Sequence, residues 1–152
     1  MLARIRNTIK HDDEGFTLIE LLVVMIIIGI LAAIAIPVFL NQRKKAQDSA
    51  AKADVSTIGN GLATYYVDGI AAPTIADVSG RYVLTSTNPA GTQDLGKISP
   101  NVTLNAEVVG AGIVSDTKWC VAVTNGQGDQ KIFKYSAKNG LATGACVAAD
   151  VS

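Results

Sequence analysis

The sequence predicts an α+β protein in which one long N-terminal helix packs against a small C-terminal antiparallel β-sheet. Three observations predict this fold class. An uncharged apolar stretch extends from Leu21 to Leu40, and apolar residues then recur at helical spacing as far as Tyr65. Further on, three stretches alternate apolar and polar residues as half-buried strands do. A chain of 152 residues is enough for one domain with a modest core, but not when much of it is a membrane segment, as the apolar stretch indicates here.

Residues 1–15 are short and charged, and we interpret them as a leader peptide. Three basic residues are followed by three acids and Gly15. The apolar stretch that comes next has about the twenty residues that an α-helix needs to cross a hydrocarbon layer of about 30 Å. Arg43, Lys44 and Lys45 follow it directly and match in number the basic residues before it. Charge alone therefore leaves the orientation of this membrane-span candidate undecided.

The helical pattern continues beyond the apolar stretch. Ala51, Val55, Ile58, Leu62 and Tyr65 alternate steps of four and three, which predicts one buried stripe. The Asp68-Gly69 pair is a plausible stop, so we predict a helix over residues 16–68, with about 16–40 as the transmembrane part. Gly59 and Gly61 are expected to weaken it locally.

Residues 69–152 are predicted to form the globular head. Residues 69–100 contain three prolines and several glycines, so we expect an irregular connection with one short strand over 82–84. Three further strands are predicted over 102–109, 119–124 and 131–136. Residues at alternate positions of the last two are expected to contact the helix stripe: Trp119, Val121, Val123, Phe133 and Tyr135.

Cys120 and Cys146 are the two cysteines of the chain, and both belong to the predicted head. Their spacing fits neither a CxxC redox pair nor a zinc site. They suggest one disulfide, which would stabilise a small head by roughly 3 kcal/mol, with two free buried thiols as the alternative.

Several classes of function are disfavoured by the sequence. Lys and Arg equal Asp and Glu in number, which argues against a protein that binds nucleic acid by neutralising phosphates. The one histidine is His11, and neither a catalytic set nor a nucleotide-binding loop is evident. The "NGQGD" stretch from Asn125 to Asp129 falls short of a calcium-loop pattern. We therefore expect no enzyme activity, no cofactor and no metal.

Glu20 lies at the edge of the apolar stretch, and three interpretations compete for it. Thr17 and Glu20 have the spacing of a capping box, which accounts for the position of the acid only while the residues before Thr17 remain attached to supply backbone groups. The region also fits a secretory signal peptide with a cleavage site near Ala35. Alternatively, the chain is cut between Gly15 and Phe16, and Glu20 pairs with the new α-amino group of its own or a neighbouring copy.

The stretch "GFTLIELLVVMIIIGILAAIAIPVFLNQRKKA" resembles the class III signal sequence and N-terminal helix of type IV pilins and pseudopilins. The resemblance implies a pilin fold, cleavage after Gly15, N-methylation of Phe16, and a role for Glu20 in assembly. It also implies a bend at Pro37, and an extended segment between Gly29 and Pro37 in the filament. The "KWCVAVTNG" and "GLATGAC" stretches are similar to actinobacterial pilin heads, which a Cys120–Cys146 disulfide would close. One departure is that Asp12, Asp13 and Glu14 stand where many relatives have basic residues.

The resemblance further implies the partners and the location of the chain. These partners are other copies of the chain, a prepilin peptidase, an assembly platform with its ATPase, and membrane lipid before assembly. The N-terminus would face the cytoplasm, and the head would reach the cell surface in a filament. A pilus subunit is therefore the leading hypothesis. A pseudopilin of a secretion or DNA-uptake system and a membrane-tethered binding module are the alternatives.

Overall fold

The computed structural model describes residues 15–105 and 113–151. Its elements in chain order are α1 (Leu18–Tyr65), β1 (Thr74–Val78), β2 (Arg81–Thr87), β3 (Ala90–Lys97), β4 (Val102–Leu104), β5 (Cys120–Asn125), β6 (Ile132–Ser136), β7 (Gly140–Thr143) and a 3₁₀ turn, η1 (Ala148–Asp150). The chain divides into two compact units, Met1–Phe39 and Leu40–Ser152, and α1 contributes residues to both. The predicted α+β class is confirmed.

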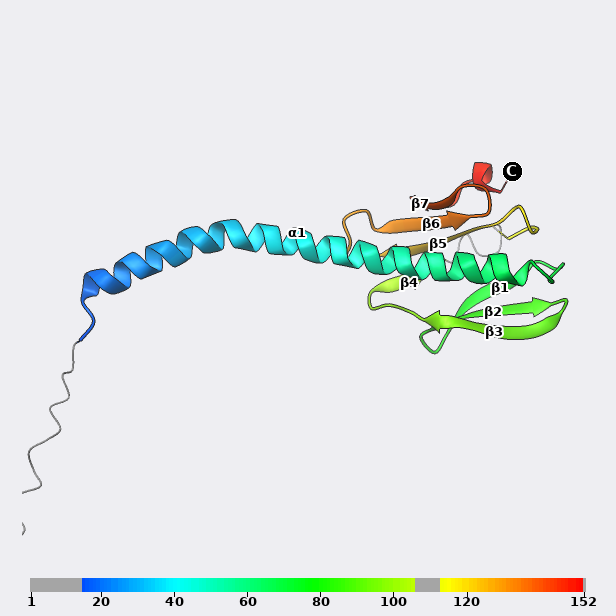
Figure 1. Ribbon diagram of the computed structural model, residues 1–152, viewed down its shortest axis with the longest axis horizontal. Helices are drawn as coiled ribbons and strands as arrows, with labels where there is room; N and C mark the ends of the chain where they lie inside the picture. Colours follow the sequence, from blue (N-terminus) through cyan, green and yellow to red (C-terminus); the bar gives the residue numbers. More distant parts are fainter. Residues whose placement is uncertain (1–14, 106–112, 152) are drawn as a thin grey trace, which may run out of the picture. The chain divides into compact units, whose positions relative to one another are not determined.

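The strands of the described residues form two antiparallel sheets, whereas one sheet was predicted (Figure 1). The first sheet has the order β1-β2-β3, and the second has the order β4-β5-β6-β7. Both sheets pack against α1 within the second unit, since their apolar side chains share one core with the helix.

The buried face of α1 has the predicted spacing. Ala51, Val55, Ile58 and Leu62 are fully buried, whereas Tyr65 is only partly buried. They share a core with Ile75, Tyr82 and Leu84 of the first sheet and with Trp119, Val121, Val123 and Phe133 from β5, β6 and the residue before β5. The predicted contact between the stripe and the later strands is therefore confirmed. Both termini of α1 lie within three residues of the predicted ones. At its C-terminal end, Gly69 N donates a hydrogen bond to Tyr65 O at 2.8 Å.

Gly59 and Gly61 allow both sheets to approach α1. A Cβ atom on Gly59 would lie 2.5 Å from the Tyr135 ring of β6, and one on Gly61 would lie 2.5 Å from Leu95 Cδ2 of β3. From the sequence, these glycines were predicted only to weaken the helix. Glycine does lower the stability of a helix, but here it also lets Tyr135 and Leu95 pack closely against the backbone of α1.

The prediction for residues 69–100 was wrong in one respect, because this connection contains three strands instead of one short one. β2 pairs on both sides, with β1 and with β3, and it carries the buried Tyr82 and Leu84. Both outer strands are mostly exposed and include Ala and Asp, and β3 also includes Gly; all three residue types are depleted in strands. Neither therefore shows the alternation by which a strand is recognised from sequence.

The second sheet agrees better with the prediction. β5 and β6 lie within one residue of the predicted strands. β4 ends at Leu104, and the remainder of the predicted strand from residue 106 lies outside the described residues. β7 was not predicted, because four residues after a turn are too few for a pattern.

Two buried carboxylates on α1 fix the helix to the head. Asp54 is 6% exposed and accepts hydrogen bonds from the Tyr82 hydroxyl and from the amide and hydroxyl of Ser99. Asp48, also 6% exposed, accepts from the amides of Gln130 and Lys131. Asp48 lies three residues before Ala51, so it extends the buried stripe by one turn. The sequence analysis missed this role for both acids.

Candidate functional site

The start of α1 holds the Thr17–Glu20 capping box. The amide and the hydroxyl of Thr17 donate to Glu20 Oε2 at 3.3 and 3.2 Å, and the Glu20 amide donates to Thr17 Oγ1 at 3.3 Å. Each side chain thus satisfies an amide that the helix start leaves free. Within the described residues, no group donates to the second carboxylate oxygen, Oε1.

Every atom of this capping box lies on the C-terminal side of the Gly15–Phe16 bond. Of the residues before Thr17, the box needs only Phe16, because the amide that Thr17 uses belongs to the Phe16–Thr17 peptide bond. The expectation that it needs preceding residues therefore holds for Phe16 and not for residues 1–15. Gly15 and Phe16 precede the helix, and the Phe16 side chain is 79% exposed. A cut between them would leave the box intact and place a new ammonium group one residue before Thr17.

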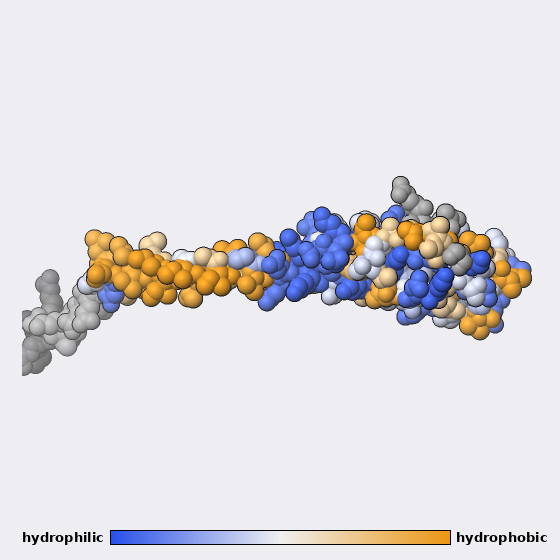
Figure 2. All heavy atoms as spheres, turned by 90° about the horizontal axis from the view of Figure 1, so that it is seen from above, coloured by the Kyte–Doolittle hydropathy of each residue, from blue (hydrophilic) through white to orange (hydrophobic). Residues whose placement is uncertain are grey.

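The helix beyond Glu20 presents apolar side chains on all sides. From Leu21 to Leu40 every residue is exposed except Ala32, which is half-buried. In Figure 2 the visible face of this part of α1 is largely hydrophobic. Among the described residues, α1 is the one helix long and apolar enough to cross a membrane. A helix that is apolar all round is typical of a segment covered by lipid or by other helices.

Gly29 and Pro37 both lie inside α1. The backbone stays helical through Pro37, although proline removes one amide donor from the ladder. Apart from its own atoms, its two chain neighbours and the nearby helix backbone, no described atom lies within 4 Å of the position where a Cβ of Gly29 would be. The segment between Gly29 and Pro37 is therefore helical in this structure. That it is extended in an assembled filament stays a prediction.

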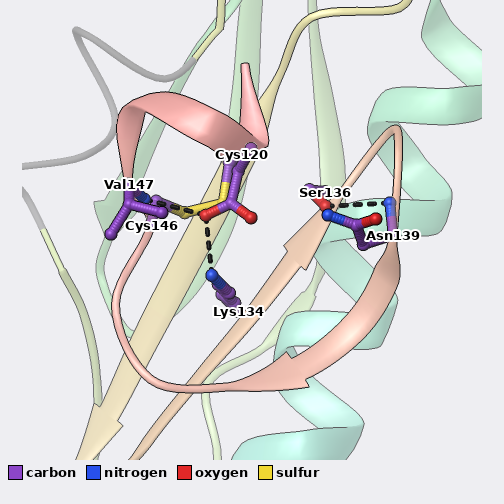
Figure 3. Close-up of a disulfide and its surroundings, with 7 residues drawn as sticks. Cys120, Lys134, Ser136, Asn139, Cys146 and Val147 are labelled. Carbon is purple, nitrogen blue, oxygen red and sulfur yellow. Dashed lines mark hydrogen bonds and ion pairs between the residues drawn. A yellow bond between two sulfur atoms is a disulfide. The ribbon is translucent and has the colours of Figure 1, made fainter. Parts of the chain in front are cut away.

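The far end of the chain is closed by the Cys120–Cys146 disulfide, with a Cα–Cα distance of 5.9 Å. Figure 3 shows it beside Lys134 and Val147. The Lys134 ammonium lies 2.7 Å from Asp150 Oδ2, which also accepts from the Val147 amide at 2.8 Å. Burial alone would raise the pKa of Asp150, but these hydrogen bonds and the Lys134 charge together hold that pKa below its usual value. A disulfide and a buried ion pair therefore hold the same C-terminal segment.

Other candidate chemistry in the head is structural. In the "NGQGD" loop, the buried Asn125 side chain donates to the carbonyl and the side-chain oxygen of Gln47, both at 3.0 Å. Across residues 15–105 and 113–151, no three His, Cys, Asp or Glu side chains gather as metal ligands would. Trp119 is 3% exposed and stacks on Tyr135, which makes it a core residue.

The N-terminal part of the chain is similar to known proteins. Residues 10–36 match the family described as the prokaryotic N-terminal methylation motif. A type II secretion system core protein G from Pseudomonas aeruginosa is 39% identical over 64 residues, which cover 42% of this chain and 45% of that protein. The N-terminal part of this chain is therefore similar to type IV pilins and pseudopilins.

Two pilins show the same partial similarity. A type IV major fimbrial protein from Dichelobacter nodosus is 43% identical over 60 residues, covering 40% of this chain and 38% of its own length. A type IV major pilin from Neisseria gonorrhoeae is 36% identical over 91 residues, covering 53% and 41%. The chain thus spans about half or less of these relatives. No solved structure matches it.

Proposed function

We propose that this chain is a structural subunit of a type IV pilus filament. The observation that carries the proposal is the juxtaposition of the exposed Gly15–Phe16 bond and the Glu20 carboxylate at the start of a fully apolar helix. In the proposed sequence, a prepilin peptidase removes residues 1–15, Phe16 is N-methylated, and membrane-held subunits enter a filament. The role is structural and not enzymatic. This scheme divides the chain into the leader 1–15, the helix segment 16–68 and the head 69–152.

The carboxylate needs a partner when the helix lies in an apolar environment. A carboxylate within a membrane helix costs about 2.5–3.5 kcal/mol on insertion scales, and a nearby cation offsets part of that cost. In the membrane, Thr17 satisfies Oε2 of Glu20 while Oε1 is available. The ammonium group of a processed neighbour supplies the missing charge, so pairing between copies favours one register of assembly.

The apolar surface of α1 supplies the remaining contact. Side chains from Leu21 to Leu40 project on every side of the helix, so several neighbouring helices can pack around each copy. The heads would then form the outer surface of the filament. Assembly would require the platform and ATPase that such filaments use, and it needs neither a cofactor nor a metal in this chain.

The test is the Glu20→Ala variant in the native host. We expect normal amounts of processed chain in the membrane fraction but little chain in sheared surface material. Asp68→Ala is the matched control, because Asp68 is an exposed acid after the end of α1. Abundant normal filaments from Glu20→Ala would contradict the proposed role of the carboxylate.

A pseudopilin of a type II secretion or competence system is the second candidate. It is supported by the identity to the core protein G of Pseudomonas aeruginosa. Two measurements separate the candidates. In the wild type, a subunit of a long pilus would be abundant in sheared surface material. In a strain that forms no surface filaments, loss of protein secretion or of transformation on deletion of the gene would favour the pseudopilin.

A further inference from the structure

Three consecutive cations follow the apolar part of α1. The side chains of Arg43, Lys44 and Lys45 are all exposed. Figure 2 shows a hydrophilic zone directly after the apolar surface of the helix. Successive residues of an α-helix are rotated by about 100°, so the three charges project over a wide arc around the helix axis.

The carboxylate best placed to neutralise these cations is engaged elsewhere. Asp48 lies four residues after Lys44 and three after Lys45, the spacings at which helical ion pairs form. Its side chain is buried against the head, where it accepts hydrogen bonds from the amides of Gln130 and Lys131 at 3.1 and 3.4 Å. Across residues 15–105 and 113–151, the ion pairs are Arg81–Asp94 and Lys134–Asp150, and neither involves this cluster.

The length of the apolar stretch places the cluster at a defined depth in a bilayer. Twenty helical residues from Leu21 to Leu40 extend about 30 Å, which equals the thickness of the hydrocarbon layer. When this stretch is inserted, residues 43–45 therefore lie among the lipid headgroups. Arginine binds phosphate oxygens through two parallel hydrogen bonds, and lysine binds phosphate as a point charge.

We propose that Arg43, Lys44 and Lys45 bind the phosphate groups of anionic lipids while the subunit is held in the membrane. This inference rests on the proposed function, since it requires the apolar stretch to be inserted with the head outside. The contact would hold the waiting subunit at one depth, and extraction of the subunit from the membrane would have to break it.

The experiment measures lipid selectivity in vesicles and does not depend on filament assembly. The full chain is reconstituted in phosphatidylcholine vesicles that contain about 30 mol% phosphatidylglycerol, which is enough to give an anionic surface. Spin-labelled phosphatidylglycerol and phosphatidylcholine then report the fraction of each lipid that the protein immobilises. Each cation near an anionic surface increases its association about fivefold.

The decisive comparison uses two triple variants with the same change in net charge. In Arg43→Gln/Lys44→Gln/Lys45→Gln, we expect the preference for phosphatidylglycerol to fall at least about threefold, as it should for the wild type in 1 M salt (Debye length about 3 Å). The control is Lys97→Gln/Lys118→Gln/Lys138→Gln, which removes exposed cations of the head and should keep the preference. Emission from Trp119 checks that both variants retain a folded head.

Two results would overturn the proposal. One is an unchanged preference in the 43–45 variant. The other is an equal loss in the control, which would indicate an effect of net charge alone. Because unprocessed chain suffices, failure here leaves the Glu20 test of filament assembly unaffected.

Discussion

The Tyr82 hydroxyl donates a hydrogen bond to Asp54 Oδ2 across 3.0 Å in the interior of the head. Burial, followed by the Asp54 charge, raises the pKa of Tyr82, so the hydroxyl stays protonated and remains a donor. The same carboxylate accepts from the Ser99 amide at 2.9 Å and from the Ser99 hydroxyl at 2.7 Å. One acid of α1 thus fixes both the first sheet and the connection between the sheets.

Replacing this acid should destabilise the head. In Asp54→Asn, the new amide group faces donors where an acceptor is needed, so we expect a loss of about 1–3 kcal/mol in the free energy of unfolding. The measurement is urea unfolding of the full chain in detergent, followed by emission of the single tryptophan, Trp119. Asp129→Asn is the control, because Asp129 is exposed, and it should unfold like the wild type.

Alanine at Gly59 should destabilise the protein even though alanine favours helices by about 1 kcal/mol. The new methyl group would meet the ring of Tyr135, which stacks on Trp119 and has little room to move. We expect a net loss of about 1–3 kcal/mol, typical of overpacking. Asn60→Ala places the same residue on the exposed side of the helix, where only the gain in propensity should be seen. A stabilised Gly59→Ala variant would contradict the packing role.

Acid should weaken the C-terminal segment through Asp150. Its pKa is lower in the folded than in the unfolded chain, so its contribution to stability is full above about pH 4 and is lost as pH falls through the lower, folded value. Asp150→Asn should therefore be less stable than wild type at pH 7, and the difference should shrink below about pH 4. Unfolding curves at pH 7, 5, 4 and 3 measure it. A difference that is independent of pH would contradict this account.

Loss of the disulfide should cost about 3 kcal/mol in the chain-entropy model, since the bridge joins residues separated by 26 positions. The Lys134–Asp150 pair should keep the C-terminal segment on the sheet when both cysteines are replaced by serine. Adding Asp150→Asn to that variant should therefore destabilise it more than Asp150→Asn destabilises the wild type. If the losses in unfolding free energy are additive in this double-mutant comparison, the disulfide and the ion pair act independently, which would contradict this account.

Elements with strong periodicity were predictable from the sequence. The stripe from Ala51 to Leu62 has the helical period, and β5 and β6 carry apolar residues on both sides of a turn-rich loop. The Thr17–Glu20 capping box was likewise visible from its spacing. In each case the local pattern is the one that the tertiary structure uses.

The rest depends on contacts between distant segments. β1 and β3 are strands because they flank β2, and residues such as Asp94 and Gly96 give no such signal by themselves. Asp48 and Asp54 read as ordinary charged helix residues until their partners, 28 to 83 positions away, are known. Similarly, the packing role of Gly59 follows only from where Tyr135 lies.

The central claim is that the chain is processed at Gly15 and assembled through the helix that begins beside Phe16. Its most direct test is intact mass with N-terminal sequencing of the protein from membranes and from sheared surface material. We predict a chain that starts at Phe16 with one added methyl group and is present in both fractions. A start near Ile36, or an uncut chain starting at Met1, would contradict the account and reduce this helix to a secretion signal or a simple anchor.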